Sequence, residues 1–189
     1  MKIAVFDIDD VVADYNEIVT YMLGKGSGED VHYMNGRYSG KTTIMDMWRD
    51  PNYFYPLKES SGAPLVYGAA NRGYDILFVT ERPAAAESTT LRWLGKNLSV
   101  DFLGVKFTRS KVGAIVDLMS KGEEIAFFID DNEIDVDEVG MTGVPSFCWG
   151  QPWNETVYPR LFLERRTDIV WCQQNDYTDA EPFWNIIGD

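Results

Sequence analysis

The sequence predicts an α/β fold in which helices cover both faces of a parallel sheet, making three layers. Strand patterns alternate with helix patterns from Gly73 onward, and strands joined by helices imply right-handed crossovers and parallel pairing. Several of the apolar segments end abruptly in carboxylate, hydroxyl or cationic residues. A segment of about fifty residues, 12–62, follows the first strand and predicts a small inserted domain, because structureless loops of that length are uncommon.

The first predicted strand spans residues 3–6, an apolar run that stops at Asp7. Four more strands are predicted at 74–80, 102–107, 124–129 and 144–149, with helices at about 83–97, 110–120 and 133–139. Pro83 suits the first turn of its helix, and Gly122 is a stop signal at the end of the next one. Ligands of parallel sheets bind at the carboxyl ends of the strands, so the residues that follow each strand are the functional candidates.

The predicted domain organisation is a core, a cap and a C-terminal extension. Residues 1–11 and 64–150 form the core, and residues 12–63 form a small helical cap that lies over the active site. The cap segment has an aromatic-rich part at 45–57, where Trp48 needs burial; a flexible surface excursion is the alternative. Residues 151–189 form an extension whose aromatic residues favour packing on the core. These aromatic residues are Trp153, Trp171, Phe183 and Trp184.

The net charge of the chain limits the kinds of substrate and partner that we expect. The chain has 189 residues, of which 30 are acidic and 17 basic, giving a net charge of −13. This charge makes long nucleic acid an unfavourable partner, because Lys and Arg must neutralise its phosphates. A small anionic substrate remains compatible, since a bound cation and a few basic side chains make a site locally positive.

The compartment and assembly are inferred from a few residue types. Two cysteines without a C-x-x-C spacing do not make a disulfide framework. No charged-then-apolar leader opens the sequence and no apolar run approaches about 20 residues, so a cytoplasmic location without membrane contact is expected. The single His32 cannot form a histidine metal cluster and is interpreted as a surface or cap residue. The oligomeric state stays open, with a homodimer as one arrangement.

Carboxylates follow two of the predicted strands. Asp7 and Asp9 come after the first strand, and Asp130 and Asp131 come at the end of strand 124–129. Carboxylates crowded at one sheet edge repel each other, and one is pushed to its neutral form unless a cation binds. With Mg²⁺ bound, one carboxylate can act as nucleophile and another as acid and base. Solvated aspartates in turns are the alternative interpretation.

Two further strand ends complete an ordered set of motifs. Thr80 ends the strand 74–80, and Arg109 and Lys111 follow the strand 102–107. The order is Asp-x-Asp, a hydroxyl residue, a lysine and an acidic pair, which resembles the haloacid dehalogenase superfamily of phosphohydrolases. The resemblance implies a haloacid dehalogenase-like Rossmannoid three-layer sandwich with a cap inserted after the first strand.

The chain also resembles the 5'(3')-deoxyribonucleotidases within that superfamily. The segment 6–15, Phe-Asp-Ile-Asp-Asp-Val-Val-Ala-Asp-Tyr, is similar to their opening, and the segment 48–63 to their Trp, Asn-Phe-Phe and Gly-Ala pieces. Further matching residues are Thr80, Pro83, Trp93, Thr108, Arg109, Lys111, Asp130 and Asp131. The resemblance spans roughly residues 1–135. Two departures are Asp10 at the usual glycine and Glu81 at the usual serine, where a carboxylate repels phosphate unless Arg82 pairs with it.

The resemblance implies a Mg²⁺-dependent phosphomonoesterase. Asp7 attacks phosphorus to form an aspartyl-phosphate, and Asp9 protonates the leaving oxygen and then activates water. The magnesium ligands implied are the Asp7 carboxylate, the Asp9 backbone carbonyl and Asp131, supported by Asp130. Thr80 hydrogen-bonds a phosphoryl oxygen, and Lys111 neutralises the charge that phosphate shares with Asp7.

The implied substrate is a nucleoside monophosphate, most simply a deoxyribonucleotide, hydrolysed as by a 5'-nucleotidase. Tyr15 and Trp48 are expected to stack on the base, although ordinary cap core is equally open for either. Arg109, Glu81 and Arg82 complete the expected substrate-binding residues.

Two other readings stay open. One is a polynucleotide 3'-phosphatase of end repair, which fits Thr80-x-Arg82-Pro83 and Leu91-x-Trp93-Leu94 but not the acidic charge. The other is a weakened phosphatase domain that acts as a sensor or binding protein. No catalytic carboxylate is lost, which counts against the second.

Overall fold

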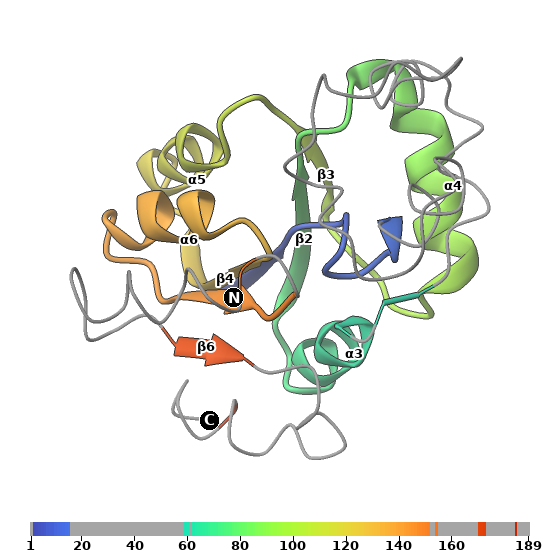
Figure 1. Cartoon of the computed structure of the whole chain (residues 1–189), viewed down its shortest axis with the longest axis horizontal. Helices are drawn as coiled ribbons and strands as arrows, with labels where there is room; N and C mark the ends of the chain where they lie inside the picture. The colour runs from blue at the N-terminus through green and yellow to red at the C-terminus, as the bar shows by residue number, and fades with distance from the viewer. Residues whose placement is uncertain are drawn as a thin grey trace.

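A six-stranded parallel sheet forms the centre of the protein (Figure 1). The computed structural model describes residues 2–15, 59–60, 62–151, 154, 170–172 and 184. The strand order is β3-β2-β1-β4-β5-β6, and every neighbouring pair is parallel. The strands are β1 (Lys2–Phe6), β2 (Asp75–Thr80), β3 (Gly104–Phe107), β4 (Glu124–Asp130), β5 (Ser146–Trp149) and β6 (Val170–Cys172).

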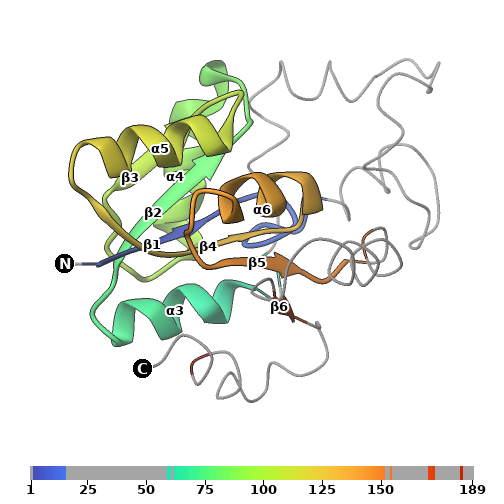
Figure 2. The same ribbon diagram turned by 90° about the vertical axis from the view of Figure 1, so that its left-hand side faces the viewer.

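Helices lie on both faces of this sheet (Figures 1 and 2). One face carries α5 (Lys111–Ser120) and α6 (Glu133–Gly140), and the other carries α3 (Ala63–Asn71) and α4 (Glu87–Asn97). Alternate residues of β1 separate the two cores: Ile3 and Val5 pack with α5 and α6, whereas Ala4 and Phe6 pack with α3 and α4. The predicted three-layer α/β fold with a parallel sheet is therefore confirmed.

The five predicted strands are all present, with shorter bounds at β3 and β5. The region predicted as one helix at 83–97 contains two elements. Pro83 caps a 3₁₀ turn, η3 (Ala84–Ala86), and α4 follows this turn directly. Helix α3, which has a proline in its first turn, was not predicted from the sequence. Ala63, the last residue of the predicted cap, begins α3.

The predicted insertion leaves and rejoins the core at adjacent points. Ala13 forms bridges with both Asp9 and Glu59, and the Ser60 amide donates to the Val12 carbonyl at 2.7 Å. Both ends of the segment 16–58 are therefore attached beside the loop that follows β1. The segment itself, including Trp48 and His32, lies outside the described residues, so the helical cap stays a prediction.

Strand β6 and Trp184 belong to the predicted C-terminal extension, and both contact the core. Strand β6 pairs with β5, and Trp184 is buried, with its ring 6.2 Å from that of Phe127. Gly68 makes room for Trp184, since a Cβ on this glycine would lie 2.5 Å from the indole. Arg72 covers the ring at 4.1 Å. Trp153 and Phe183 lie outside the described residues, as do the side chains of β6.

Within the described ranges, no helix is both long enough and apolar enough to cross a membrane.

Candidate active site

The loop after β1 places the first candidate residues. Asp7 donates its amide to the Ile129 carbonyl of β4 at 2.9 Å, and the amides of Val12 and Ala13 both turn back to the Ile8 carbonyl. Asp10 has a positive φ of 59°, a conformation that favours glycine and that Asp tolerates better than most residues. The turn after β1 is therefore retained even though Asp10 stands where the family that the sequence resembles has glycine.

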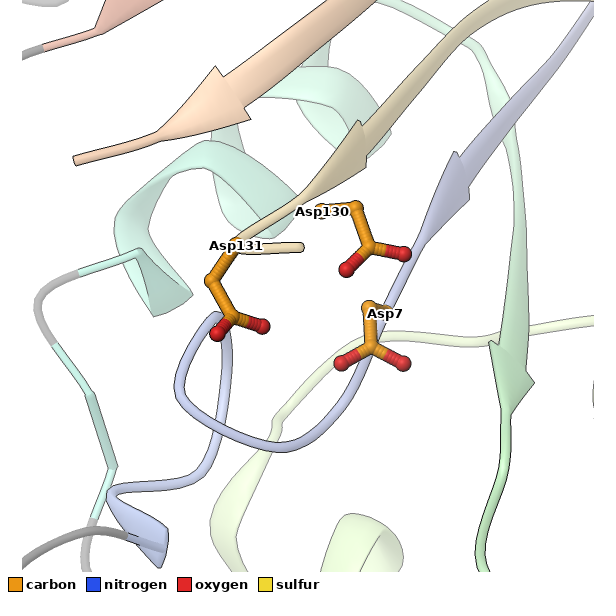
Figure 3. A group of neighbouring side chains, drawn as sticks. All are labelled: Asp7, Asp130 and Asp131. Carbon is orange, nitrogen blue, oxygen red and sulfur yellow. The ribbon is translucent and has the colours of Figure 1, made fainter. Parts of the chain in front are cut away.

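Three carboxylates converge at the carboxyl ends of β1 and β4 (Figure 3). Asp7, Asp130 and Asp131 each bring an oxygen within 4.8 Å of the others, and all three residues are buried. Adjacent parallel strands end at the same sheet edge, which is why residues so far apart in sequence meet.

Lys111 is the cation of this cluster. Its ammonium lies 2.7 Å from Asp130, 3.1 Å from Asp7 and 3.3 Å from Asp135, and its side chain is only 5% exposed. Burial works to lower the pKa of Lys111, but these three carboxylates more than offset it and hold the pKa well above its usual value. A lysine in the first turn of a helix is disfavoured by the helix dipole, so the carboxylates hold it there.

Burial raises the pKa of Asp7 to about 7, against the opposing effect of Lys111 and with help from Asp131 and Asp9. Burial likewise raises the pKa of Asp130 well above its usual range, although Lys111 opposes this. The described cluster is thus short of positive charge: three carboxylates share one ammonium, and Asp131 lies beside them.

The Asp9 carboxylate forms an ion pair with Arg82. Arg82 donates from Nη2 to Asp9 Oδ1 at 2.6 Å and from Nε to Oδ2 at 2.9 Å. The Arg82 side chain is fully buried, and its backbone amide donates to the Thr80 hydroxyl at 3.2 Å. Thr80 is buried at the end of β2, where its hydroxyl hydrogen can be donated to another oxygen.

The remaining predicted binding residues are dispersed. Arg109 and Glu81 are exposed residues of the loops after β3 and β2. Tyr15 is buried and belongs to the same apolar cluster as residues of α3 and α4. Trp48 lies outside the described residues. The structure therefore brings together Asp7, Asp130, Asp131 and Lys111, with Asp9, Arg82 and Thr80 as a second connected group.

Known proteins share this architecture at low sequence identity. No protein-family model and no curated protein matches the sequence. A haloacid dehalogenase-like family hydrolase from Streptococcus pneumoniae is 16% identical with a TM-score of 0.57, over 92% of this chain and 95% of its own. A dehalogenase is 13% identical with a TM-score of 0.60, over 97% and 96%. The class C acid phosphatase of Bacillus anthracis is 15% identical with a TM-score of 0.51, over 93% and 68%.

The chain has the haloacid dehalogenase-like fold. At these identities the likeness is one of fold, and the chemistry rests on the residues of this chain.

Three further residues support the site without having been predicted from the sequence. Asp135 is the third carboxylate on Lys111 and also accepts from Asn132 at 3.0 Å. The buried Asn154 donates to the Asp131 carbonyl at 2.7 Å and to the Trp149 carbonyl at 2.9 Å. Gln151 donates to the Asp10 carbonyl at 2.5 Å. The acidic first turn of α6 was a signal for Asp135, whereas no sequence pattern marks Gln151 or Asn154.

The donor set fits a magnesium ion. Mg²⁺ prefers carboxylate oxygens and needs few of them because it keeps several waters. Asp7 and Asp131 each offer a carboxylate oxygen to such an ion. Both oxygens of Asp130 already accept hydrogen bonds, one from Lys111 and one from the Asn132 amide, so Asp130 supports rather than ligates. The crowding of buried carboxylates is itself the feature that a divalent cation relieves.

We expect the metal-free protein to lose stability as pH rises from about 4 to about 7. In this window folded Asp7 keeps a proton that the unfolded chain, with an Asp pKa of 3.8, has released, so unfolding becomes easier with rising pH. Mg²⁺ binds the ionised form, and the rise in melting temperature that it causes should grow across the same window. Thermal unfolding at several pH values, with Mg²⁺ or with EDTA, measures both trends. A magnesium shift that is absent, or equal at all pH values, contradicts the site.

Proposed function

We propose that this protein is a Mg²⁺-dependent phosphomonoesterase that works through an aspartyl-phosphate on Asp7. The observation that carries the proposal is the contact of buried Asp7 with Lys111 at 3.1 Å, beside Asp130 and Asp131 at the same sheet edge. A carboxylate nucleophile needs a neighbouring cation, because a phosphate ester brings negative charge toward it.

The proposed reaction has two steps. An Asp7 carboxylate oxygen forms a bond to phosphorus while the bond from phosphorus to the leaving oxygen breaks, and Asp9, which enters this step protonated, gives its proton to the leaving oxygen. Asp9 then takes a proton from water, and the water oxygen attacks phosphorus, releasing phosphate and the Asp7 carboxylate. Lys111 holds Asp7 and neutralises charge, and Thr80 donates to a phosphoryl oxygen. Bound Mg²⁺ supplies further charge neutralisation at Asp7 and the phosphate.

The proposed substrate is a deoxyribonucleoside monophosphate. The resemblance of residues 6–15 to the deoxyribonucleotidase opening supports it, as does the net charge of −13, which favours a small anion over a polyanion. The attachment of the segment 16–58 beside Asp9 also supports it, because a cap joined there can cover a small substrate.

A polynucleotide 3'-phosphatase is the second candidate, and one observation favours it. Its motif Thr-x-Arg matches Thr80 and Arg82, and Arg82 is a buried partner of Asp9 rather than a surface residue.

We expect hydrolysis of deoxyribonucleoside monophosphates and poor hydrolysis of 3'-phosphorylated oligonucleotides. A phosphate-release panel tests this with both substrates, a 5'-phosphorylated oligonucleotide of the same sequence as control, and 4-nitrophenyl phosphate as a base-free substrate. Trp48→Ala should raise KM for the mononucleotide more than for 4-nitrophenyl phosphate, by roughly tenfold, since one base stack contributes about 1–3 kcal/mol.

Faster hydrolysis of the 3'-phosphorylated oligonucleotide than of the mononucleotide would identify the protein as a polynucleotide 3'-phosphatase of end repair instead. Equal KM changes on the mononucleotide and the aryl phosphate would remove Trp48 from base recognition.

A further inference from the structure

The pair between Asp9 and Arg82 is built into the fold. The guanidinium meets both carboxylate oxygens, at 2.6 and 2.9 Å, with the Arg82 side chain 0% and the Asp9 side chain 17% exposed. Two parallel N–H···O bonds from a planar guanidinium fix the plane of a carboxylate as well as its position. Asp9 therefore has one preferred orientation.

Arg82 is held from its other side. Its Nη1 donates to the hydroxyl of Thr90 at 3.0 Å, and Thr90 is completely buried on α4. Its backbone amide is tied to Thr80 at the end of β2. A helix and a strand end thus hold the guanidinium in place. Because the guanidinium is fixed, the Asp9 carboxylate that it bonds is held in place as well.

We propose that Arg82 is a positioning residue that orients Asp9 for proton transfer to the leaving oxygen, with the proton carried on Oδ2, which accepts one bond from Arg82 and keeps a second lone pair. The inference rests on the proposed function and goes beyond it, since the sequence predicted Arg82 as a substrate contact or a partner of Glu81 and not as a partner of Asp9. A buried arginine that meets Asp9 and Thr90 with three of its nitrogens acts on the substrate through Asp9.

A positioning role predicts a dependence on the leaving group. An alkyl leaving group, such as the sugar oxygen of a nucleotide, needs a proton as its bond to phosphorus breaks, whereas 4-nitrophenolate leaves without one. General acid catalysis contributes typically 10²–10⁴-fold. Misorienting Asp9 should therefore slow alkyl phosphates and spare aryl phosphates.

The test compares kcat/KM for an alkyl and an aryl phosphate in wild type and Arg82→Gln. This constant covers only steps up to departure of the leaving group, so the later use of Asp9 as a base does not enter it. We expect Arg82→Gln to lose about a hundredfold on the alkyl phosphate and about threefold or less on 4-nitrophenyl phosphate. Arg82→Lys keeps the charge but not the two-bond fork and should fall between. Arg92→Gln, at an exposed arginine of α4, is the matched control and should leave the ratio unchanged.

A double-mutant cycle links the effect to Asp9. In an Asp9→Asn background, Arg82→Gln should cost little more on the alkyl phosphate, because the group that it orients is already lost. The ratio of the two substrates does not depend on how much enzyme is folded. If Arg82→Gln does not fold, the same ratio is read from Arg82→Lys and Thr90→Val.

The outcomes separate this inference from the proposed function. Equal losses on both substrates, or full additivity with Asp9→Asn, overturn the positioning role. A wild-type protein that hydrolyses neither phosphate overturns the proposed function itself.

Discussion

Asp7→Asn is expected to abolish phosphate release, by at least about a thousandfold, without loss of the fold. An amide oxygen cannot form the acyl phosphate, and losing the group that makes the covalent bond costs on this order or more. The substitution also removes a buried carboxylate whose pKa is raised to about 7. We therefore expect the metal-free variant to melt no lower than wild type above neutral pH, because one source of repulsion is gone.

The control for Asp7→Asn is Asp101→Asn, at an exposed aspartate before β3, which should retain full activity. Circular dichroism and thermal unfolding establish that both variants are folded. Activity of Asp7→Asn above about one per cent of wild type, at equal folding, excludes Asp7 as the nucleophile.

Lys111→Gln is expected to have the second largest effect, on both stability and activity. It leaves Asp7, Asp130 and Asp135 without the ammonium that they share. Removing one partner of a buried ion pair costs about 3–5 kcal/mol, so denaturant unfolding near neutral pH should show a loss of this order. At lower pH the loss should shrink, because Asp7 and Asp130 have raised pKa values and become neutral there.

The same helix supplies the matched control for Lys111. Lys121 follows the other end of α5 and also pairs with an aspartate at 2.7 Å, but this pair with Asp117 is exposed. Lys121→Gln should leave stability and activity essentially unchanged, since exposed ion pairs contribute little. Equal, small effects of the two substitutions would mean that the buried cluster does not depend on Lys111.

The fold was largely predictable because its signals are local. Strands such as β1 and β4 are buried on both faces of the sheet. Their sequences are therefore continuous apolar runs, which are recognisable as strands. The meeting of Asp7 with Asp130 and Asp131 was predictable too, because parallel strands bring their carboxyl ends to one edge.

The side-chain partners within the site were not predictable. The partner of Arg82, whether Glu81, substrate or Asp9, is set by its side-chain rotamer and by where α4 places Thr90. Neither of these can be inferred from the spacing of residues in the sequence. The support that Asn154 gives to Asp131 arises from a segment beyond the motif-bearing region, and only the tertiary structure brings the two together. Strand β6, three residues long, is too short for a recognisable strand pattern.

The most direct test of the central claim is to trap phosphate on Asp7. Enzyme with Mg²⁺ is mixed with a ³²P-labelled phosphate ester, quenched in acid within the first turnovers, digested and mapped by mass spectrometry. The account predicts labelled phosphate on the peptide that contains Asp7, released by hydroxylamine as an acyl phosphate is, and absent in Asp7→Asn. Turnover without any covalent label, or label on a residue other than Asp7, would contradict it.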